Sequence, residues 1–187
     1  MRRIVPILLL VSVVPVAKAA DGDSIESAVR AIYEAISGPA GNRDWARFRS
    51  LFASGARLIS MRVAAGATTP VVMTVEDYIT RAGANFEKNA FYETEAAKRT
   101  ETFGSIAHVF STYESRRAPA EKPFSRGINS FQLVKDGKEW KVMTILWDSE
   151  REGNPLPEKY LASPAPTHIA LCCGGMGISA SPQPERD

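Results

Sequence analysis

The segment SRGINSFQLVKDGKEWKVMTILWD, residues 125–148, decides the fold, because it contains two β-rich runs joined by Asp136 and Gly137. Asp-Gly between such runs is among the strongest short-range signals for a hairpin, since both central positions of a type I′ turn need positive φ. A third strand is predicted upstream, over residues 106–113. Three long antiparallel strands in succession predict a curled sheet at the core.

A helix with one apolar face is predicted near the start of the chain. Asp23 as N-cap and Glu26 three positions later form a capping-box pattern. Apolar residues then recur at helical spacing and form a stripe that other parts of the fold must cover. The stripe consists of Ile25, Ala28, Val29, Ile32, Tyr33 and Ile36.

Two shorter helices and a hairpin are expected between this helix and the long strands. Asp44 is the predicted N-cap of the second helix, and Thr74 that of the third. Between them, residues 56–64 and 70–73 are expected to pair as strands, and residues 90–102 form a fourth long strand. Helices followed by antiparallel strands predict an α+β fold whose helices pack on one face of a bent sheet.

The first nineteen residues have the pattern of a cleaved signal peptide. Arg2 and Arg3 precede an apolar run over residues 4–16, and small residues follow it. The run is shorter than the roughly 20 residues that a membrane-spanning helix needs, so a membrane anchor is the weaker alternative. We therefore expect a periplasmic or secreted protein with one globular domain over residues 20–161.

The last part of the chain, residues 162–187, is rich in Pro, Gly, Ser and Ala and has no periodic apolar face. Such a segment buries too little surface to offset its ordering entropy, so we predict a flexible tail. Its two cysteines, Cys172 and Cys173, are neighbours in sequence and cannot form a long-range disulfide. We interpret them as incidental thiols, with a bond to a second chain or metal binding as alternatives.

Charge and motif content exclude several classes of function. Loss of residues 1–19 removes Arg2, Arg3 and Lys18 and leaves basic and acidic side chains nearly balanced, without a Lys/Arg stripe. Nucleic acid or an anionic membrane is therefore not expected as a partner. The sequence contains no catalytic-triad order, phosphate-binding loop, dinucleotide-binding glycine pattern or zinc-ligand spacing, so neither cofactor nor metal is expected.

This order of elements resembles the nuclear transport factor 2-like (NTF2-like) superfamily, and within it the SnoaL-like branch of exported bacterial proteins. The features that carry the resemblance are the opening amphipathic helix, the helix over 44–52 leading into a strand through 56–59, the helix start at 74–78, and the closing segment 131–142. The resemblance spans roughly residues 24–150.

The resemblance implies a cone-like half-barrel, in which a strongly curved, mostly antiparallel sheet wraps round the N-terminal helices. In this superfamily the open end often holds a small apolar ligand, and the outer face of the sheet often pairs with a second subunit. Members include isomerases, dehydratases, cyclases and binding proteins, so the fold does not fix the activity. Steroid isomerases of the superfamily place a basic carboxylate on the early strands, whereas residues 58–72 contain no acid.

Five residues on strands expected to be adjacent are candidates to line the cavity: His108, Glu114, Arg126, Asn129 and Trp147. His108, the only histidine of the predicted domain, is the candidate general base or hydrogen-bond anchor, with a structural or outward-facing histidine as the alternative. For Arg126 and Glu114 the alternative is an exposed cross-strand ion pair. Asparagine is uncommon in the middle of strands, and a tryptophan indole needs a hydrogen-bond partner when it is buried, so Asn129 and Trp147 are the better cavity candidates.

Both faces of the last predicted strand are largely apolar. Strict alternation assigns Trp140, Val142, Thr144 and Leu146 to one face, and Lys141, Met143, Ile145 and Trp147 to the other. A strand buried on two sides fits a sheet that packs helices inside and a second subunit outside, so we expect a homodimer through the outer sheet face. A monomer with some exposed Trp is the alternative.

Three functions are compatible with these patterns. The first is an exported domain that binds a small, mostly apolar molecule in its cone. The second is an enzyme of the isomerase or dehydratase type that uses His108, with Arg126 or Asn129, for proton transfer. The third is a non-catalytic association module whose cone is filled by its own side chains.

Overall fold

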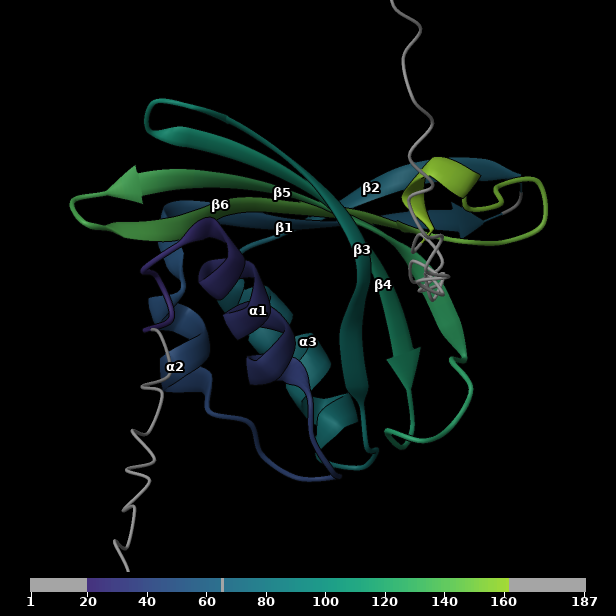
Figure 1. Ribbon diagram of the computed structural model, residues 1–187. Coiled ribbons are helices and arrows are strands. Elements are labelled where there is room, and N and C mark those ends of the chain that lie inside the picture. The colour runs from purple at the N-terminus through teal and green to yellow at the C-terminus, as the bar shows by residue number, and fades with distance from the viewer. Residues whose placement is uncertain (1–19, 65, 162–187) are drawn as a thin grey trace, which may run out of the picture.

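The computed structural model describes residues 20–64 and 66–161, and the predicted signal peptide and tail lie outside them. The order of helices and strands matches the predicted one (Figure 1). The elements are α1 (Ile25–Ile36), α2 (Trp45–Ser50), β1 (Phe52–Ala64), β2 (Ala67–Met73), α3 (Val75–Phe86), β3 (Tyr92–Phe103), β4 (Ile106–Arg116), β5 (Ser125–Asp136), β6 (Glu139–Ser149) and the short 3-10 helix η1 (Glu158–Tyr160).

The six strands form one sheet in the order β2-β1-β6-β5-β4-β3. All neighbouring strands are antiparallel except β1 and β6, which run parallel. The sheet is strongly curved, and α1 lies against its concave side with β3 and β4 curling down beside it (Figure 1). The predicted α+β half-barrel, with its mostly antiparallel sheet wrapped round the N-terminal helices, is confirmed.

The hairpin that decided the fold is present with its turn one residue later than predicted. Asp136 still pairs with Glu139, so Gly137 and Lys138 are the two loop residues. Gly137 has φ of 62°, a conformation that glycine adopts without steric cost.

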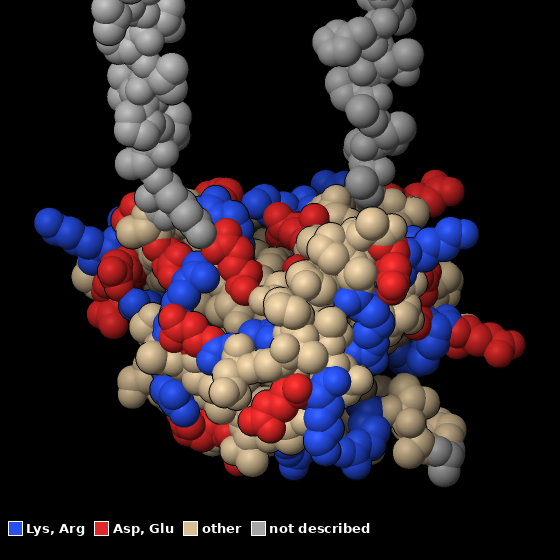
Figure 2. All heavy atoms as spheres, turned by 90° about the horizontal axis from the view of Figure 1, so that it is seen from below, with Lys and Arg blue, Asp and Glu red and all other residues tan. Residues whose placement is uncertain are grey.

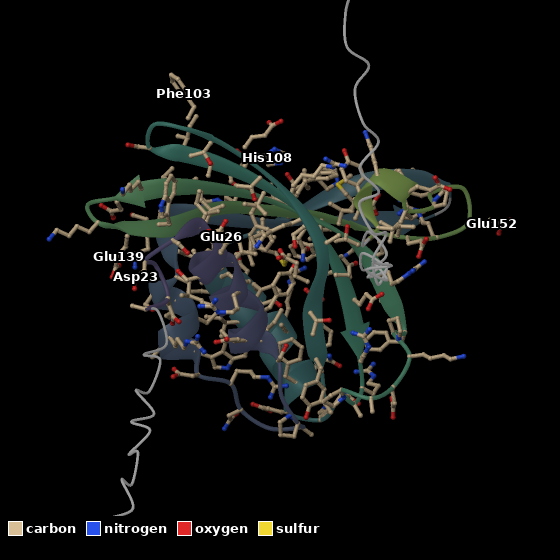
Figure 3. All side chains as sticks on the ribbon, viewed as in Figure 1. Asp23, Glu26, Phe103, His108, Glu139 and Glu152 are labelled. Atoms are coloured by element: carbon tan, nitrogen blue, oxygen red, sulfur yellow. The ribbon has the colours of Figure 1, made fainter. Side chains whose placement is uncertain are left out.

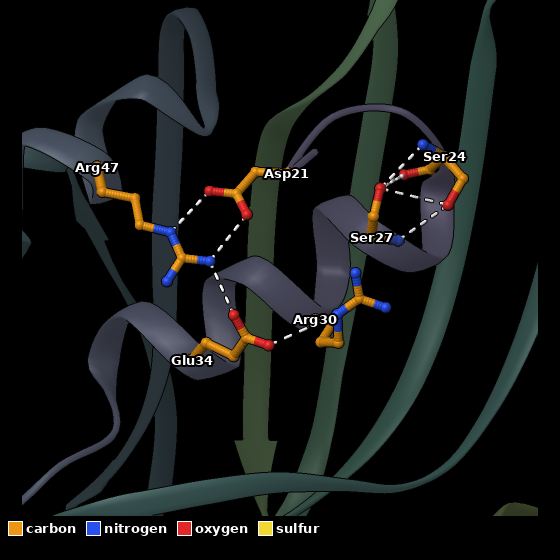
Figure 4. Close-up of polar contacts among 6 residues, drawn as sticks. All are labelled: Asp21, Ser24, Ser27, Arg30, Glu34 and Arg47. Carbon is orange, nitrogen blue, oxygen red and sulfur yellow. Dashed lines mark hydrogen bonds and ion pairs between the residues drawn. The ribbon is translucent and has the colours of Figure 1, made fainter. Parts of the chain in front are cut away.

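The helix caps follow the predicted chemistry with one correction. The N-cap of α1 is Ser24 and not Asp23: Ser24 Oγ accepts from the Ser27 N–H at 3.0 Å, and the Ser24 N–H donates to Ser27 Oγ at 2.9 Å (Figure 4). Serine at the third helical position thus replaces the acid that the capping-box pattern led us to expect. Asp44 and Thr74 cap α2 and α3 as predicted.

An ion-pair network joins the two N-terminal helices (Figure 4). Arg47 of α2 donates to both carboxylate oxygens of Asp21, at 2.7 and 2.8 Å, and to Glu34 of α1 at 2.8 Å. A bidentate arginine contact fixes orientation as well as distance. The network therefore holds both α2 and Asp21, which precedes α1 in the chain, against α1.

The core lies between α1 and the concave side of the sheet. The apolar stripe of α1 is buried as predicted, except that Ile25 is only partly buried, and it packs with residues from the inner face of the central strands. Val109, Phe131 and Val142 have no solvent exposure at all. Burial of these side chains provides the main stabilisation of the fold.

A β-bulge in β6 corrects the predicted faces of the last strand. Leu133 pairs with Val142 and Gln132 with Thr144, so Met143 is the extra residue. Side chains therefore change face at Met143. Trp140 and Val142 point inward before the bulge and Ile145 points inward after it, whereas Leu146 is 39% exposed on the outer face.

The chain after β6 returns across the outer face of β3 and β4. The Tyr160 ring packs on Phe110 with centroids 4.9 Å apart, and its carbonyl accepts a hydrogen bond from Thr112 Oγ1 at 2.5 Å. Arg99 donates to the carbonyl of Lys159 at 3.1 Å. This strap, residues 155–161, covers part of the outer face that the predicted dimer would use.

The surface carries charges of both signs. On the face seen from below, Lys and Arg alternate with Asp and Glu, with no continuous basic stripe (Figure 2). None of the helices in the described ranges is long and apolar enough to cross a bilayer. Those ranges also contain no group of three or more His, Cys, Asp or Glu side chains arranged to hold a metal ion.

Candidate functional site

A cavity of about 240 Å³ lies between the helices and the concave face of the sheet. All three helices and five of the strands contribute to it, and the segment before β5 adds an aromatic ring. Its lining consists of Ile32, Ile36, Phe48, Leu58, Tyr78, Phe91, Glu93, Tyr113, Ser115, Phe124, Ser125, Asn129, Phe131, Ile145, Trp147 and Ser149.

Aromatic rings form much of the cavity wall. Phe48 of α2 stacks on Tyr78 of α3 at 5.4 Å between centroids, and Tyr78 meets Trp147 of β6 edge to face at 6.4 Å. Phe91 packs against Phe124 at 6.3 Å, and Phe124 is 51% exposed. Because Phe124 both lines the cavity and reaches solvent, it marks the rim.

Strand pairing places the polar groups of the site together. Glu93 of β3 pairs with Ser115 of β4, which pairs with Ser125 of β5, so one row across three strands carries a carboxyl and two hydroxyl groups. In the adjacent row Tyr113 lies opposite Gly127, and its hydroxyl reaches Ser149 Oγ at 2.8 Å. The cavity therefore has a polar side on β3, β4 and β5.

Glu93 is the central polar residue of the cavity. Its Oε2 accepts a hydrogen bond from Ser115 Oγ at 2.8 Å, and its Oε1 accepts one from Asn129 Nδ2 at 3.4 Å. Burial raises the pKa of the Glu93 carboxyl, and these two hydrogen bonds oppose the shift. Among residues 20–64 and 66–161, no Lys, Arg or His lies in the lining.

A directed chain of hydrogen bonds orients Asn129. Ser111 Oγ donates to Glu95 Oε2 at 2.6 Å, so the Tyr33 hydroxyl must donate to Ser111 Oγ, 2.7 Å away. Tyr33 Oη can then accept from Asn129 Nδ2 at 3.1 Å. This fixes the Asn129 amide with its NH₂ group toward both Tyr33 and Glu93. Burial raises the pKa of Tyr33, which stays a neutral donor.

The Tyr78 hydroxyl is a further polar group of the lining. It makes no hydrogen bond to any side chain or backbone group in the described ranges, and burial raises the pKa of Tyr78. No fully buried side-chain nitrogen or oxygen in these ranges lacks a partner, so the unpaired Tyr78 hydroxyl is open to the cavity. Tyr78 can therefore donate to a molecule in the cavity.

Comparison with known proteins identifies the fold. No protein-family model and no curated protein matches the sequence. Among solved structures, an NTF2-like protein of unknown function from Pseudomonas putida has a TM-score of 0.52 at 12% identity, over 66% of this chain and 82% of its own. The chain has the NTF2-like fold.

Two further solved structures match this fold with similar TM-scores and similarly low sequence identities. A protein of unknown function with a cystatin-like fold from Nostoc punctiforme has a TM-score of 0.53 at 11% identity, over 67% of this chain and 88% of its own. A protein from Thiobacillus denitrificans, named for the association domain of calcium/calmodulin-dependent protein kinase type II, has 0.54 at 10% identity, over 70% and 98%. At these identities the likeness extends to the fold alone.

Two of the five predicted site residues line the cavity of this NTF2-like fold. Asn129 is 7% exposed and bonded to Glu93, and Trp147 stands opposite Tyr78. Trp147 is only partly buried, so its indole N–H, which makes no hydrogen bond within the described part of the chain, does not need the partner expected of a buried indole. Asn129 has its partners, which explains a mid-strand asparagine.

His108 does not reach the cavity, and that prediction is wrong. Its neighbours Ala107 and Val109 point inward, so strand alternation turns His108 to the outer face, away from α1 (Figure 3). There His108 Nε2 lies 3.0 Å from Ser130 Oγ and the ring packs against Phe110. The alternative of an outward-facing histidine is the correct one.

Arg126 and Glu114 also lie outside the cavity, because their side chains point to the outer face of the sheet, as that of His108 does. Arg126 pairs with Glu150 at 2.7 Å, and Glu114 pairs with Arg116. The alternative of a direct Arg126–Glu114 ion pair is wrong as well, although the two residues do lie opposite each other in the ladder. Each side chain has a nearer partner of opposite charge.

Sequence reasoning missed Glu93, the acid of the cavity. The search for a carboxylate was confined to residues 58–72, whereas this acid comes from the edge strand β3. One signal was available: Glu93 stands two residues after Phe91, on the same face of a strand. Its polar neighbours Thr94 and Glu95 favoured the prediction of a half-exposed strand.

Proposed function

We propose that this protein binds a small, mostly apolar molecule in the cone cavity. The observation that carries the proposal is the combination of an aromatic and aliphatic wall with a few converging polar groups, which is how small-molecule sites are generally built. Tyr78 and Glu93 offer hydrogen bonds that the protein itself does not use up. An empty cavity also argues against a cone filled by its own side chains.

The cavity volume bounds the size of the ligand. An engineered apolar cavity of about 150 Å³ holds benzene, so about 240 Å³ corresponds to roughly ten non-hydrogen atoms. A one-ring compound with a short polar substituent fits this limit. 2-Phenylethanol is a suitable neutral probe.

Titration of 2-phenylethanol by calorimetry, with NMR of the Trp147 indole N–H, tests the proposal. A dissociation constant of about 1 mM needs about 4.1 kcal/mol, or roughly half a kcal/mol for each non-hydrogen atom of the probe, well within the range of small ligands. Ser125→Phe fills the cavity and should abolish binding. Ser130→Phe places the same ring on the outer face of the same strand and should leave binding intact.

Two results would contradict cavity binding. One is the absence of saturable binding in the wild type. The other is equal binding by wild type and a folded Ser125→Phe variant, which would place the probe elsewhere on the protein.

A second candidate function is proton transfer on the bound molecule, with Glu93 in the role first given to His108. Burial shifts the pKa of the Glu93 carboxyl upward, toward the operating pH at which general acid–base catalysis is most efficient. Deuterium exchange of phenylacetone, followed by NMR, measures such transfer. Exchange catalysed by the wild type and lost in Glu93→Gln supports it, and equal rates in the two proteins count against it.

We also propose a homodimer through the part of the outer sheet face that the strap leaves open. Val72 of β2 is 58% exposed and Leu146 of β6 is 39% exposed, and both pair with Ile59 of β1, so they form one apolar row. The name of the Thiobacillus denitrificans neighbour, an association domain, is consistent with assembly. Light scattering should give a dimer that Leu146→Glu dissociates; Phe103→Glu, at the 83%-exposed tip of β3, should not affect it.

Export remains the proposal for the location of the protein, on the basis of the N-terminal sequence pattern. N-terminal sequencing of the protein from a periplasmic fraction should begin near Ala20. Recovery of the chain with Met1 intact from the cytosol would overturn it.

A further inference from the structure

We infer that the cavity selects an apolar organic cation, an amine or a methylated ammonium ion, with Glu93 as its counter-ion. This inference rests on the proposed binding function and names the chemical class of the ligand. Three features of the lining carry it: its charge, the unused hydrogen-bonding capacity of Glu93, and its aromatic content.

Within the described part of the chain, the lining contains one carboxyl group and no basic side chain. Glu93 takes part in no ion pair in residues 20–64 and 66–161, whereas the neighbouring acid Glu95 is paired with Lys98 at 3.1 Å. A carboxylate removed from water is costly unless a cation compensates it. Because no basic side chain of the described ranges pairs with Glu93, a cationic ligand is the species that would gain most from this site.

Glu93 also keeps acceptor capacity for a ligand. Two carboxylate oxygens offer about four lone-pair positions, and Ser115 and Asn129 occupy two of them. Both donors are fixed, since Asn129 is held by Tyr33 and Ser115 by its place opposite Glu93 in the ladder. The carboxylate is therefore oriented, and an ammonium N–H can use the remaining positions.

Seven of the sixteen lining residues are aromatic, and aromatic faces attract cations. The protein's own cations already use such faces: Arg117 lies 4.4 Å from the ring centre of Phe124 at the cavity rim, and Arg43 lies 5.0 Å from that of Phe86. Neither arginine is part of the lining. Aromatic rings around a single carboxylate are a suitable environment for an amine with an apolar body.

Three basic side chains, Arg30, Lys98 and Arg116, line a second hollow together with Glu93, but each is paired with another carboxylate, Glu34, Glu95 or Glu114. Tyr33 of α1, Tyr78 of α3 and Tyr113 of β4 face Glu93, and burial raises the pKa of each, so all three are neutral near pH 7. Glu95, on the same strand, bonds Ser111 and Lys98. Affinity for a cation should therefore rise with pH as Glu93 ionises, while affinity for a neutral molecule should not.

A matched pair of probes tests the inference by calorimetry. Phenethylamine and 2-phenylethanol are both of about nine non-hydrogen atoms and differ only in the ammonium group, and both fit the cavity volume. At pH 8 the amine should bind wild type about 30-fold more tightly, the ratio expected for a desolvated charge pair worth about 2 kcal/mol. The preference should shrink as pH falls.

Glu93→Gln should remove the preference for the amine and retain binding of 2-phenylethanol. Glu101→Gln, which changes an exposed carboxyl farther along the same strand, opposite the outward-facing His108, should keep the preference. If Glu93→Gln does not fold, the wild-type ratio of affinities and its pH dependence decide alone. Equal affinities for the two probes at pH 8, or a preference that survives Glu93→Gln, overturn the inference while the binding function stands. Failure of both probes to bind refutes the binding function itself.

Discussion

Replacement of Gly127 by alanine is the sharpest test of how the sheet is packed beside the cavity. Gly127 lies in β5 with ordinary extended backbone, so alanine creates no conformational strain there. A Cβ atom at this position would stand 2.2 Å from the Asp148 carbonyl oxygen and 2.6 Å from the Tyr113 hydroxyl. Gly127 is therefore present because two neighbours occupy the space of a side chain.

The expected cost follows from these distances. To reach an ordinary contact of about 3.4 Å, the Asp148 carbonyl must retreat by roughly 1.2 Å, where β5 and β6 are paired. Overpacking of this kind costs about 1–3 kcal/mol. Displacement of Tyr113 also breaks its 2.8 Å hydrogen bond to Ser149, worth about 1 kcal/mol. We expect Gly127→Ala to lower the free energy of unfolding by about 3 kcal/mol.

Urea denaturation measures this loss, with Gly83→Ala as the matched control. A Cβ on Gly83 of α3 would meet Trp45 at 3.5 Å, an ordinary contact, and alanine favours helix by about 1 kcal/mol. The same substitution should therefore destabilise at one site and stabilise at the other. A Gly127→Ala variant within 0.5 kcal/mol of wild type, which is about the scatter expected of neutral changes, would refute the packing argument.

Three further changes test other parts of the structure. Because burial raises the pKa of Glu93, the free energy of unfolding should decrease as pH rises above the ordinary glutamate pKa of 4.5. In denaturation at different pH values, Glu93→Gln should be more stable than wild type at pH 8 and equal to it below pH 4.5. Arg47→Met removes contacts to two carboxylates and should cost about 1–2 kcal/mol by denaturation, whereas Arg49→Met, at an exposed ion pair, should leave the free energy of unfolding almost unchanged. Thr74→Ala removes the N-cap of α3 and should lower Tm, at a cost of about 1 kcal/mol; an unchanged Tm would contradict the cap.

The architecture could be predicted because it depends on local signals. Helical spacing located α1, Asp44 and Thr74 marked helix starts, and Asp136 with Gly137 marked the last hairpin. These patterns involve residues close together in sequence. The order of the strands in the sheet, with β1 beside β6, has no such signal.

The site was less predictable because it depends on which face a side chain takes. A single-residue error in parity moves a residue from the cavity to the outer face, as with His108. The bulge at Met143 changes parity within one strand, so both Val142 and Ile145 are buried. The apolar residue Val109 indicates which face of β4 points inward. By strand alternation, this would have placed His108 on the outer face and Ser111 and Ser115 on the inner face.

The parallel pairing of β1 with β6 delays the point during translation at which β1 can join the sheet. These strands are separated by most of the domain, so their contacts have a high sequence separation and form slowly. During synthesis, β1 and β2 leave the ribosome long before their only bridge to the other four strands exists. The nascent hairpin must stay unpaired until translation has passed Ser149, and an early stop codon would leave it with an open edge suited to aggregation.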